Sequence, residues 1–214
     1  MFNDYVDPVY RPPSEANSLI LQVTIGCSWN RCTFCEMYTD PAKKFRVRGE
    51  DEIEAQLIRV AASGMPVRRV FLADGDAMSL STRRLGRFLE LIRTHLPGVQ
   101  RVSAYCLPRN LRNKGIDDLE RLRDLGLQLL YVGCESGDDT VLERVSKGET
   151  FESSRQSLDK MRTAGLKRSI MILNGLGGTA YSEQHAINSA RLMNEAQPDF
   201  LSTLVVTFPK GDRR

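Results

Sequence analysis

Long apolar segments are scarce in this sequence of 214 residues. The longest apolar runs are far too short to span a bilayer, for which a helix needs about 20 residues. The N-terminal residues carry neither a basic start nor an apolar stretch of the kind found in secretory signals. Hydrophobic residues make up 41% and charged residues 27%, which are ordinary values for a globular protein. The sequence therefore predicts one cytoplasmic domain, long enough to bury a sizeable core.

A surplus of charge of one sign is also lacking. The formal net charge is +3, and Lys and Arg are interleaved with Asp and Glu. This pattern is typical of a solvated mixed surface and gives no indication of nucleic-acid binding. The chain has one short basic run, formed by Lys43, Lys44, Arg46 and Arg48 around Phe45. This run either faces an acidic substrate or a reducing partner such as flavodoxin, or it forms a solvated turn.

Histidines are few, and the number of cysteines is odd. The two histidines, His95 and His185, fall within helical patterns. Three of the five cysteines, Cys27, Cys32 and Cys35, lie close together directly after an apolar run. An odd number of cysteines with three in a cluster favours a reducing compartment and a metal site over a disulfide framework.

The three clustered cysteines predict a metal centre. Thiolates are soft ligands that select zinc or iron–sulfur clusters over hard cations. A structural zinc site normally has a fourth protein ligand, which here would be a histidine far away in the sequence. A cubane cluster on three cysteines leaves one iron open to another ligand. An iron–sulfur cluster is the favoured interpretation, and zinc and incidental thiols are the alternatives.

Apolar segments of strand length alternate with helical patterns along the rest of the chain. Nearly continuous apolar character, as in 19–25, is typical of a parallel strand covered on both faces. Between these segments apolar residues recur at helical spacing, as they do at Leu85, Phe88, Leu89 and Ile92. Strands that alternate with helices in this way require a parallel sheet. The predicted strands are 19–25, 69–73, 102–105, 127–132, 169–173 and 200–206.

The predicted fold class is α/β, with a partial (β/α)6 TIM-like barrel. A full eight-stranded barrel takes about 250 residues, so six strand–helix units correspond to an incomplete one. Candidate functional residues follow several strands at their carboxyl ends, where barrels build active sites. An open doubly wound sheet, which binds its ligand at a switch point, is the alternative. Residues 1–18, with Pro8, Pro12 and Pro13, predict an extended lead-in that wraps a core domain over 19–214.

The stretch from Thr24 to Cys35 resembles the cluster loop of the radical S-adenosylmethionine (radical SAM) superfamily. The usual spacing in that loop is Cys-x3-Cys-x2-Cys, whereas this chain has Cys-x4-Cys-x2-Cys. Together with Met37, Tyr38 and the 44–48 stretch, it resembles an uncharacterised subgroup with the wider gap. An irregular loop accommodates an extra residue easily, because its backbone is not fixed by helical hydrogen bonds.

The resemblance implies an enzyme that binds a [4Fe–4S] cluster and S-adenosylmethionine. Cys27, Cys32 and Cys35 are then both the metal ligands and catalytic residues. One electron from the reduced cluster cleaves the cofactor to methionine and a 5′-deoxyadenosyl radical, which abstracts hydrogen from a substrate. The implied reductant is a protein such as flavodoxin or ferredoxin. The rival interpretations are a non-catalytic iron–sulfur protein that binds or senses, and a zinc-binding α/β module.

Two further motifs resemble cofactor-binding segments of the superfamily. Asp74, Gly75 and Asp76 follow the second predicted strand, where relatives hold the amino group of the methionine moiety. A glycine lets backbone approach a ligand and carboxylates accept from an ammonium, although Asp-Gly-Asp is also a common turn. Glu135 and Ser136 lie in a Gly-x-Glu-Ser-Gly segment whose acidic residue binds the ribose in relatives. The alternative role for Glu135 is that of a helix cap.

Four other residues complete the implied cofactor site. Phe34 occupies the aromatic position that packs against the adenine in relatives. Leu173 and Asn174 resemble the stretch that lines the adenine from the other side. Lys147 lies in a stretch that can reach the cofactor carboxylate, with stabilisation of a helix dipole as the competing explanation.

The remaining cysteines, Cys106 and Cys134, are predicted to be structural, because two lone thiols cannot complete a second cubane and buried cysteines are common. No second cluster motif, cobalamin-binding domain or RNA-binding extension is visible, so the substrate stays unidentified. The chain stops at 209–214, where members of the superfamily usually continue. It is expected to be either a truncated form or a minimal core whose open side is covered by another subunit.

Overall fold

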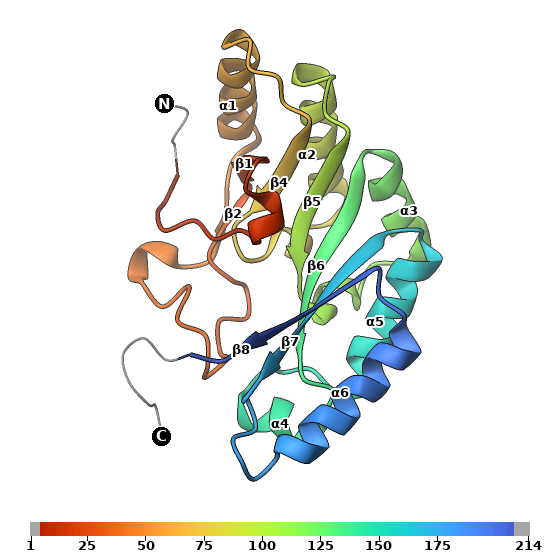
Figure 1. The fold of residues 1–214 in the computed structure, drawn as a ribbon. Helices are drawn as coiled ribbons and strands as arrows, with labels where there is room; N and C mark the ends of the chain where they lie inside the picture. The colour runs from red at the N-terminus through yellow and green to blue at the C-terminus, as the bar shows by residue number, and fades with distance from the viewer. Residues whose placement is uncertain (1–4, 208–214) are drawn as a thin grey trace.

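Six parallel strands form the sheet at the centre of the molecule. The computed structural model describes residues 5–207, and in it the strands are arranged in the order in which they occur along the chain. Each strand pairs in parallel with the next, and Figure 1 shows the resulting curved sheet. The strands are β1 (Leu19–Gln22), β4 (Arg69–Ala73), β5 (Arg101–Cys106), β6 (Leu127–Glu135), β7 (Lys167–Asn174) and β8 (Phe200–Val205).

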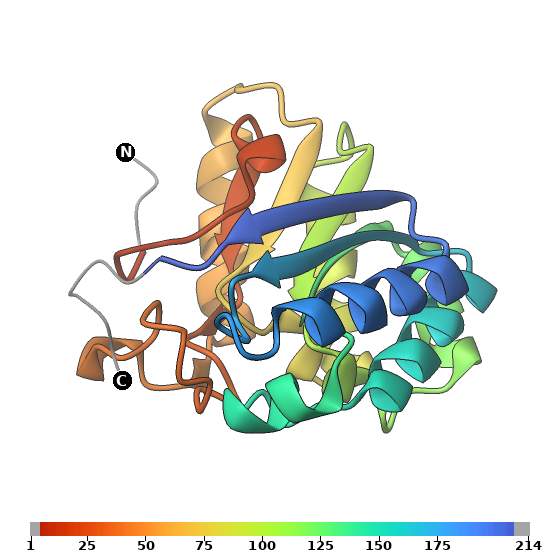
Figure 2. The same ribbon diagram turned by 60° about the horizontal axis from the view of Figure 1, so that its bottom comes forward.

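Helices connect the strands and pack on the outer face of the sheet, as Figure 2 shows for α5 and α6. In a barrel, neighbouring strands follow one another in the order of the sequence, whereas in a doubly wound sheet the strand order reverses at a switch point. The predicted partial barrel is therefore confirmed and the doubly wound alternative is wrong. Over residues 5–207, β1 and β8 remain unpaired edges, so the barrel is open. The helices are α1 (Glu50–Ala62), α2 (Thr82–His95), α3 (Ile116–Asp124), α4 (Asp139–Arg144), α5 (Phe151–Thr163) and α6 (Ser182–Ala196).

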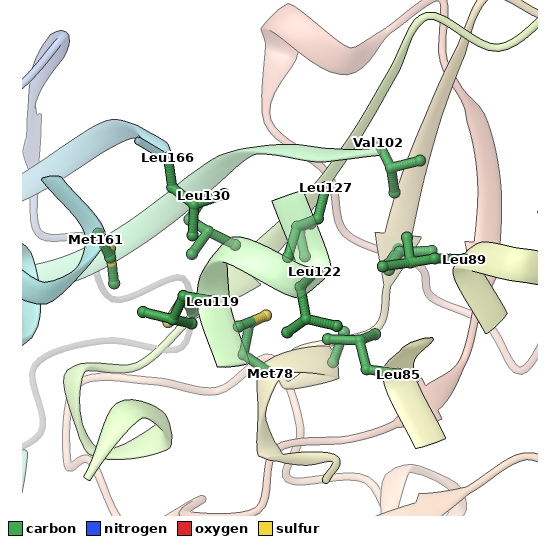
Figure 3. Packing of buried hydrophobic residues seen from close by; sticks show 14 of the residues in the cluster. Met78, Leu85, Leu89, Val102, Leu119, Leu122, Leu127, Leu130, Met161 and Leu166 are labelled. Carbon is green, nitrogen blue, oxygen red and sulfur yellow. The ribbon is translucent and has the colours of Figure 1, made fainter. Parts of the chain in front are cut away.

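The main hydrophobic core lies between the sheet and the helices. Along β4, Val70 and Leu72 belong to this core, whereas Phe71 and Ala73 belong to a smaller cluster on the concave face. Such alternation is expected of a strand that is covered on both sides. Figure 3 shows part of the main core, where side chains of α2, α3 and β6 meet.

Helix α2 illustrates how the apolar periodicity produces this packing. Ser81 directly precedes it and caps it, because its side chain accepts a hydrogen bond from the amide of Arg84. Burying an aliphatic or aromatic side chain contributes about 1.5–3 kcal/mol relative to leaving it exposed, so a stripe of four is a large term. The whole predicted apolar face is buried: Leu85, Phe88, Leu89 and Ile92.

The first predicted strand, 19–25, is divided in two. β1 ends at Gln22, and β2 (Thr24–Ile25) then pairs antiparallel with β3 (Arg46–Val47) outside the main sheet. The amide of Val23 still donates to the carbonyl of Ala73, so the chain leaves the sheet gradually. An uninterrupted apolar run carries no sign of this change of partner, so the predicted single strand is wrong at its end.

The described part of the lead-in, residues 5–18, runs along the concave face of the sheet. The hydroxyl of Tyr5 donates to the carbonyl of Ile20, and the backbone of Val6 bonds the side-chain amide of Gln22. Much of the segment lacks regular structure, as predicted, but Pro13–Glu15 forms one turn of 3-10 helix. The boundary between a lead-in and a core at residue 18 stays a prediction.

The last strand, β8, is the most exposed part of the sheet. Phe200, Leu201, Leu204 and Val205 are each more than half exposed. Over residues 5–207, the longest and most apolar helices still fall short of what a membrane crossing requires. The chain end at 209–214, for which a truncated or minimal core was expected, lies outside the described residues.

Candidate metal centre and cofactor site

The three clustered cysteines lie on an irregular loop between β2 and β3, next to the carboxyl ends of β1 and β4. Because β2 and β3 pair with each other, both ends of the loop are held together. Gly26 opens the loop with a φ of 75°. A Cβ at this position would stand 2.0 Å from the carbonyl oxygen of Lys43, so only glycine permits this close approach.

Hydrogen bonds anchor the loop to two other parts of the barrel rim. The amide and the hydroxyl of Ser28 both donate to Oδ2 of Asp76, the amide at 3.2 Å. The indole Nε1 of Trp29 donates to the carbonyl of Ser146 at 2.8 Å, in the turn after α4. The amide of Thr33 donates to the same turn at 3.0 Å. The position of the thiols therefore depends on the turns that follow β4 and α4.

The three thiols are partly buried and influence one another. Burial raises the pKa of all three, that of Cys32 to about 11. The charge of Cys35 raises the pKa of both Cys27 and Cys32, whereas Lys147 lowers the pKa of Cys32 and Cys35. Ligation by a metal requires the thiolate, so metal binding here releases protons.

This donor set fits an iron–sulfur cluster. Over residues 5–207, no three Cys, His, Asp or Glu side chains converge closely enough to hold a single metal ion. Cysteines that bind a [4Fe–4S] cluster converge less tightly, because each thiolate binds a different iron atom. Three neighbouring thiols on one loop, with a cation beside two of them, fit a cluster better than a closed zinc site.

Glu135 and Lys147 form a buried ion pair beside the thiols. Nζ of Lys147 lies 3.1 Å from Oε1 of Glu135, and their side chains are only 4% and 14% exposed. Burial by itself lowers the pKa of Lys147, but Glu135 and Cys32 outweigh it, so this pKa is raised. The same ammonium lies 5.9 Å from the ring centre of Phe34. Three residues predicted to bind cofactor thus gather around the cysteines.

Asp74 and Asp76 are fully buried and already have partners. Asp74 Oδ2 lies 2.8 Å from Nζ of Lys43 and accepts from Gln22, whereas Asp76 accepts from Ser28 of the cysteine loop. Oδ1 of each carboxylate is buried and makes no hydrogen bond of good geometry within the described residues, although the side chains of Tyr38 and Asn110 interact with Asp74 and Asp76, respectively. Carboxylates of this kind can accept hydrogen bonds from an ammonium group. Their role toward the amino group of a cofactor stays a prediction.

Gly75, between the two carboxylates, is confined by an aromatic ring. A Cβ on Gly75 would stand 2.5 Å from the ring of Tyr38, so a larger residue would displace that ring. Burial and the Asp74 carboxylate raise the pKa of Tyr38, which therefore stays protonated. The turn after β4 is consequently held in place by the ring of Tyr38 as well as by the hydrogen bonds of its two carboxylates.

The other predicted cofactor residues, Ser136, Leu173 and Asn174, lie at the same edge of the sheet, but they contact α6 and β8. The hydroxyl of Ser136 is 2.8 Å from Nδ1 of His185 on α6 and is completely buried. Leu173 and Asn174 end β7, where they pair in register with β8, and Asn174 is exposed. Within the described residues, no hydrogen bond joins these side chains to the cysteine loop. Their assignment to the cofactor stays a prediction.

The basic run after the cysteines is not one surface. Lys43 is fully buried against Asp74, and Arg48 is 8% exposed and bonded to Gln56. Only Lys44 and Arg46 are exposed, as a solvated turn predicts. The four residues are divided because residues in a short loop follow no period that separates buried from exposed positions. That the exposed pair faces an acidic substrate or a reducing partner stays a prediction.

Two residues at the loop were missed by the sequence analysis. The guanidinium carbon of Arg109 lies 3.5 Å from the ring centre of Trp29, and that ring packs on Gly148. Trp29 is the one tryptophan of the chain and lies between two of the cysteines, which could have suggested a role. Cys106 and Cys134 are buried as predicted, and burial raises the pKa of both thiols, that of Cys134 to about 12.

Comparison with known proteins places this site in context. The family described as the Radical SAM superfamily matches residues 21–193. The heme chaperone HemW of Bacillus subtilis (strain 168) is 23% identical over 157 residues, which cover 72% of this chain and 41% of the relative. This chain therefore spans less than half the length of that curated relative.

Solved structures share the fold. Coproporphyrinogen III oxidase (HemN) from Escherichia coli, described as a radical SAM enzyme, has a TM-score of 0.70 at 21% identity over 89% of this chain and 44% of its own. The radical S-adenosylmethionine methyltransferase TsrM from Kitasatospora setae has a TM-score of 0.68 at 18% identity over 87% of this chain and 35% of its own. Methylornithine synthase (PylB) has a TM-score of 0.65 at 17% identity over 89% and 53%.

Proposed function

This chain belongs to the radical SAM superfamily of enzymes, and we propose on this basis that it holds a [4Fe–4S] cluster on Cys27, Cys32 and Cys35 and binds S-adenosylmethionine next to it. When bound and reduced, the cluster supplies the electron that splits the cofactor into methionine and a 5′-deoxyadenosyl radical, which abstracts hydrogen from a substrate. The residues of this chain ligate, orient and enclose these groups.

The observation that carries the proposal is the position of the Glu135–Lys147 pair. A protein that needed only a metal would need only the thiols, yet this buried pair lies beside Cys32 and Cys35 with Phe34 over the ammonium. S-adenosylmethionine offers hydroxyls to an acceptor, a carboxylate to a cation and a planar base to an aromatic ring. The three side chains match these three features.

The pair also has a cost that a cofactor would offset. Burying two charges is favourable only when their geometry is good and further hydrogen bonds satisfy the remaining atoms. Glu135 uses Oε1 for Lys147, and a ribose would supply donors to this carboxylate. Lys147 would in turn gain the cofactor carboxylate as a second anion. We infer that Glu135 binds the ribose and Lys147 the carboxylate.

Anaerobic reconstitution with iron and sulfide tests the proposal. The reconstituted protein should be brown, with iron and sulfide in cluster proportion, and should give the electron paramagnetic resonance signal of a reduced cluster. With dithionite it should cleave S-adenosylmethionine slowly to 5′-deoxyadenosine. A colourless zinc protein would favour the zinc module, and an intact cluster without cofactor binding in calorimetry would favour the sensor.

The proposed reductant and the proposed cellular compartment follow from the chemistry of the cluster and of the cysteines. The cluster requires a one-electron reductant, for which flavodoxin or ferredoxin is the proposed source. Five free cysteines support a reducing, cytoplasmic compartment. The substrate is not assigned, because the relatives that share the fold act on different molecules by their names and the likeness to them is one of fold.

A further inference from the structure

The outer side of the cysteine loop carries a group of arginines around Trp29, here called the arginine rim and formed by Arg31, Arg109 and Arg112. The guanidinium carbons of Arg109 and Arg31 lie 3.5 Å and 5.0 Å from the ring centre of Trp29. Arg109 and Arg112 both donate to the backbone carbonyl of Gly148, in the turn to which the loop is anchored. The rim therefore joins the loop, the turn after α4 and the 3-10 turn Pro108–Leu111.

The positive charge of this rim is directed outward. Glu149 lies behind it, with Oε1 at 3.0 Å from Nε of Arg109 and Oε2 at 3.5 Å from Arg112, but its side chain is only 1% exposed. The side chain of Arg112 is 57% exposed, and Arg31 is exposed as well. Arg109 and Arg112 thus share one buried carboxylate, and the exposed Arg31 adds a third guanidinium group to the rim. Their field on the solvent side is positive.

The rim lies next to the thiols. Trp29 lies within the cysteine loop, two residues after Cys27 and three before Cys32. Its ring turns outward to the two guanidinium groups, and its Nε1 is bonded to Ser146. An anionic surface that contacted the rim would therefore come close to the metal centre without passing through the concave face, along which the N-terminal segment runs.

Charge and residue composition together favour a protein partner over a nucleic acid. Nucleic-acid binding needs many phosphate contacts, whereas the rim offers three arginines on a chain of net charge +3. A flat indole flanked by guanidinium groups is a composition typical of protein–protein contacts, where Trp and Arg are enriched.

We propose that the arginine rim is the docking surface for an acidic one-electron transfer protein. The inference rests on the proposed function, because it assigns the route by which the cluster is reduced. One electron leaves the donor, which is oxidised, and enters the cluster, which is reduced, and no bond forms or breaks at the interface. Opposite charges at the contact speed the encounter and make it sensitive to salt.

The test compares two reductants on the reconstituted protein. Reduced flavodoxin is the probe, dithionite is the small-molecule control, and the bleaching of cluster absorbance is followed by stopped flow. The double variant Arg31→Glu/Arg112→Glu reverses the two exposed charges and leaves Trp29 and Arg109 in place. Arg83→Glu/Arg93→Glu, at two exposed positions on α2, makes the same change in overall charge and is the matched control.

We expect the double variant to lower the second-order rate of reduction by flavodoxin by about tenfold or more, while the dithionite rate stays unchanged. The parent rate should fall steeply between about 50 and about 500 mM salt, because screening shortens the reach of the charges. An unchanged flavodoxin rate in Arg31→Glu/Arg112→Glu, or an equal loss in Arg83→Glu/Arg93→Glu, would overturn the docking surface. A protein that assembles no cluster would instead overturn the proposed function.

Discussion

Replacing Lys43 by methionine should destabilise this protein more than any surface substitution. Nζ of Lys43 lies 2.8 Å from Oδ2 of Asp74, and both side chains have no exposed surface. The same ammonium donates to the carbonyl of Val6, and Gln22 donates to the same carboxylate oxygen. One buried charge pair thus joins the N-terminal segment, the end of β1, the cysteine loop and the turn after β4.

The magnitude follows from what the substitution leaves behind. Methionine has a volume similar to that of lysine, so little cavity forms, but Asp74 loses its countercharge in a site without water contact. Removing one partner of a buried ion pair costs about 3–5 kcal/mol. The remaining hydrogen bond from Gln22 offsets little, since it is present in the parent as well. Whole-domain stabilities are about 5–15 kcal/mol, so this loss is a large fraction of the total.

Urea unfolding of the cluster-free protein, followed by circular dichroism, measures this loss. Lys44→Met is the matched control, because Lys44 is the exposed neighbour and its loss should change stability by about 0.5 kcal/mol or less. Adding Asp74→Asn to Lys43→Met removes both charges and should recover at least half of the loss. If the free energy of unfolding of Lys43→Met lay within about 1 kcal/mol of that of the parent, the Lys43–Asp74 pair would not be a buried electrostatic link between these segments.

Three further predictions concern the site and its surroundings. Alanine at any one of the loop cysteines should abolish the cluster by iron and sulfide analysis, whereas Cys106→Ser/Cys134→Ser should keep it; the reverse would move the metal to other residues. Glu135→Ala should weaken S-adenosylmethionine binding in calorimetry by about 1–3 kcal/mol with iron content unchanged, and an unaltered affinity would return Glu135 to a purely structural role. Burial lowers the pKa of His185 below its ordinary value, so on acidification the histidine of the unfolded chain binds a proton at a higher pH than that of the folded chain. The free energy of unfolding should therefore fall as the pH drops from about 7.5 to about 5.5. His185→Gln should remove that part of the pH dependence in urea titrations, and a slope equal to that of the parent would contradict the assignment.

The fold could be predicted because its strands and helices leave regular patterns of apolar residues in the sequence. Near-continuous apolar segments indicated strands buried on both faces, and helical spacing indicated the elements between them. The β2–β3 pair could not be found this way, because strands of two residues carry no period. It matters nonetheless, since it separates residues 24–25 from β1 and holds the ends of the cysteine loop together.

The site was predictable where residue chemistry alone identifies a role. Three thiols in one loop indicate a metal whatever their exact positions. Glu135 and Lys147, which only the resemblance to the superfamily implied, lie beside these thiols, and their role stays a prediction. The fate of Lys43 was not predictable. A lysine among other basic residues reads as solvated, and only the approach of Asp74 from β4 makes its burial favourable.

The extra residue between the first two cysteines is accommodated both by the local backbone conformation and by hydrogen bonds to other parts of the fold. Four residues separate Cys27 from Cys32, and Asn30 among them adopts a left-handed φ of 42°, which asparagine tolerates better than most residues. Its side chain donates to the carbonyl of Tyr38, while Ser28 and Trp29 are anchored to the turns after β4 and α4. The longer gap is therefore held by hydrogen bonds of three residues, Ser28, Trp29 and Asn30. Because the partners of Ser28 and Trp29 lie in other parts of the barrel rim, the loop can reach its final shape only when the barrel is assembled, and the spacing of the thiols is a property of the whole fold.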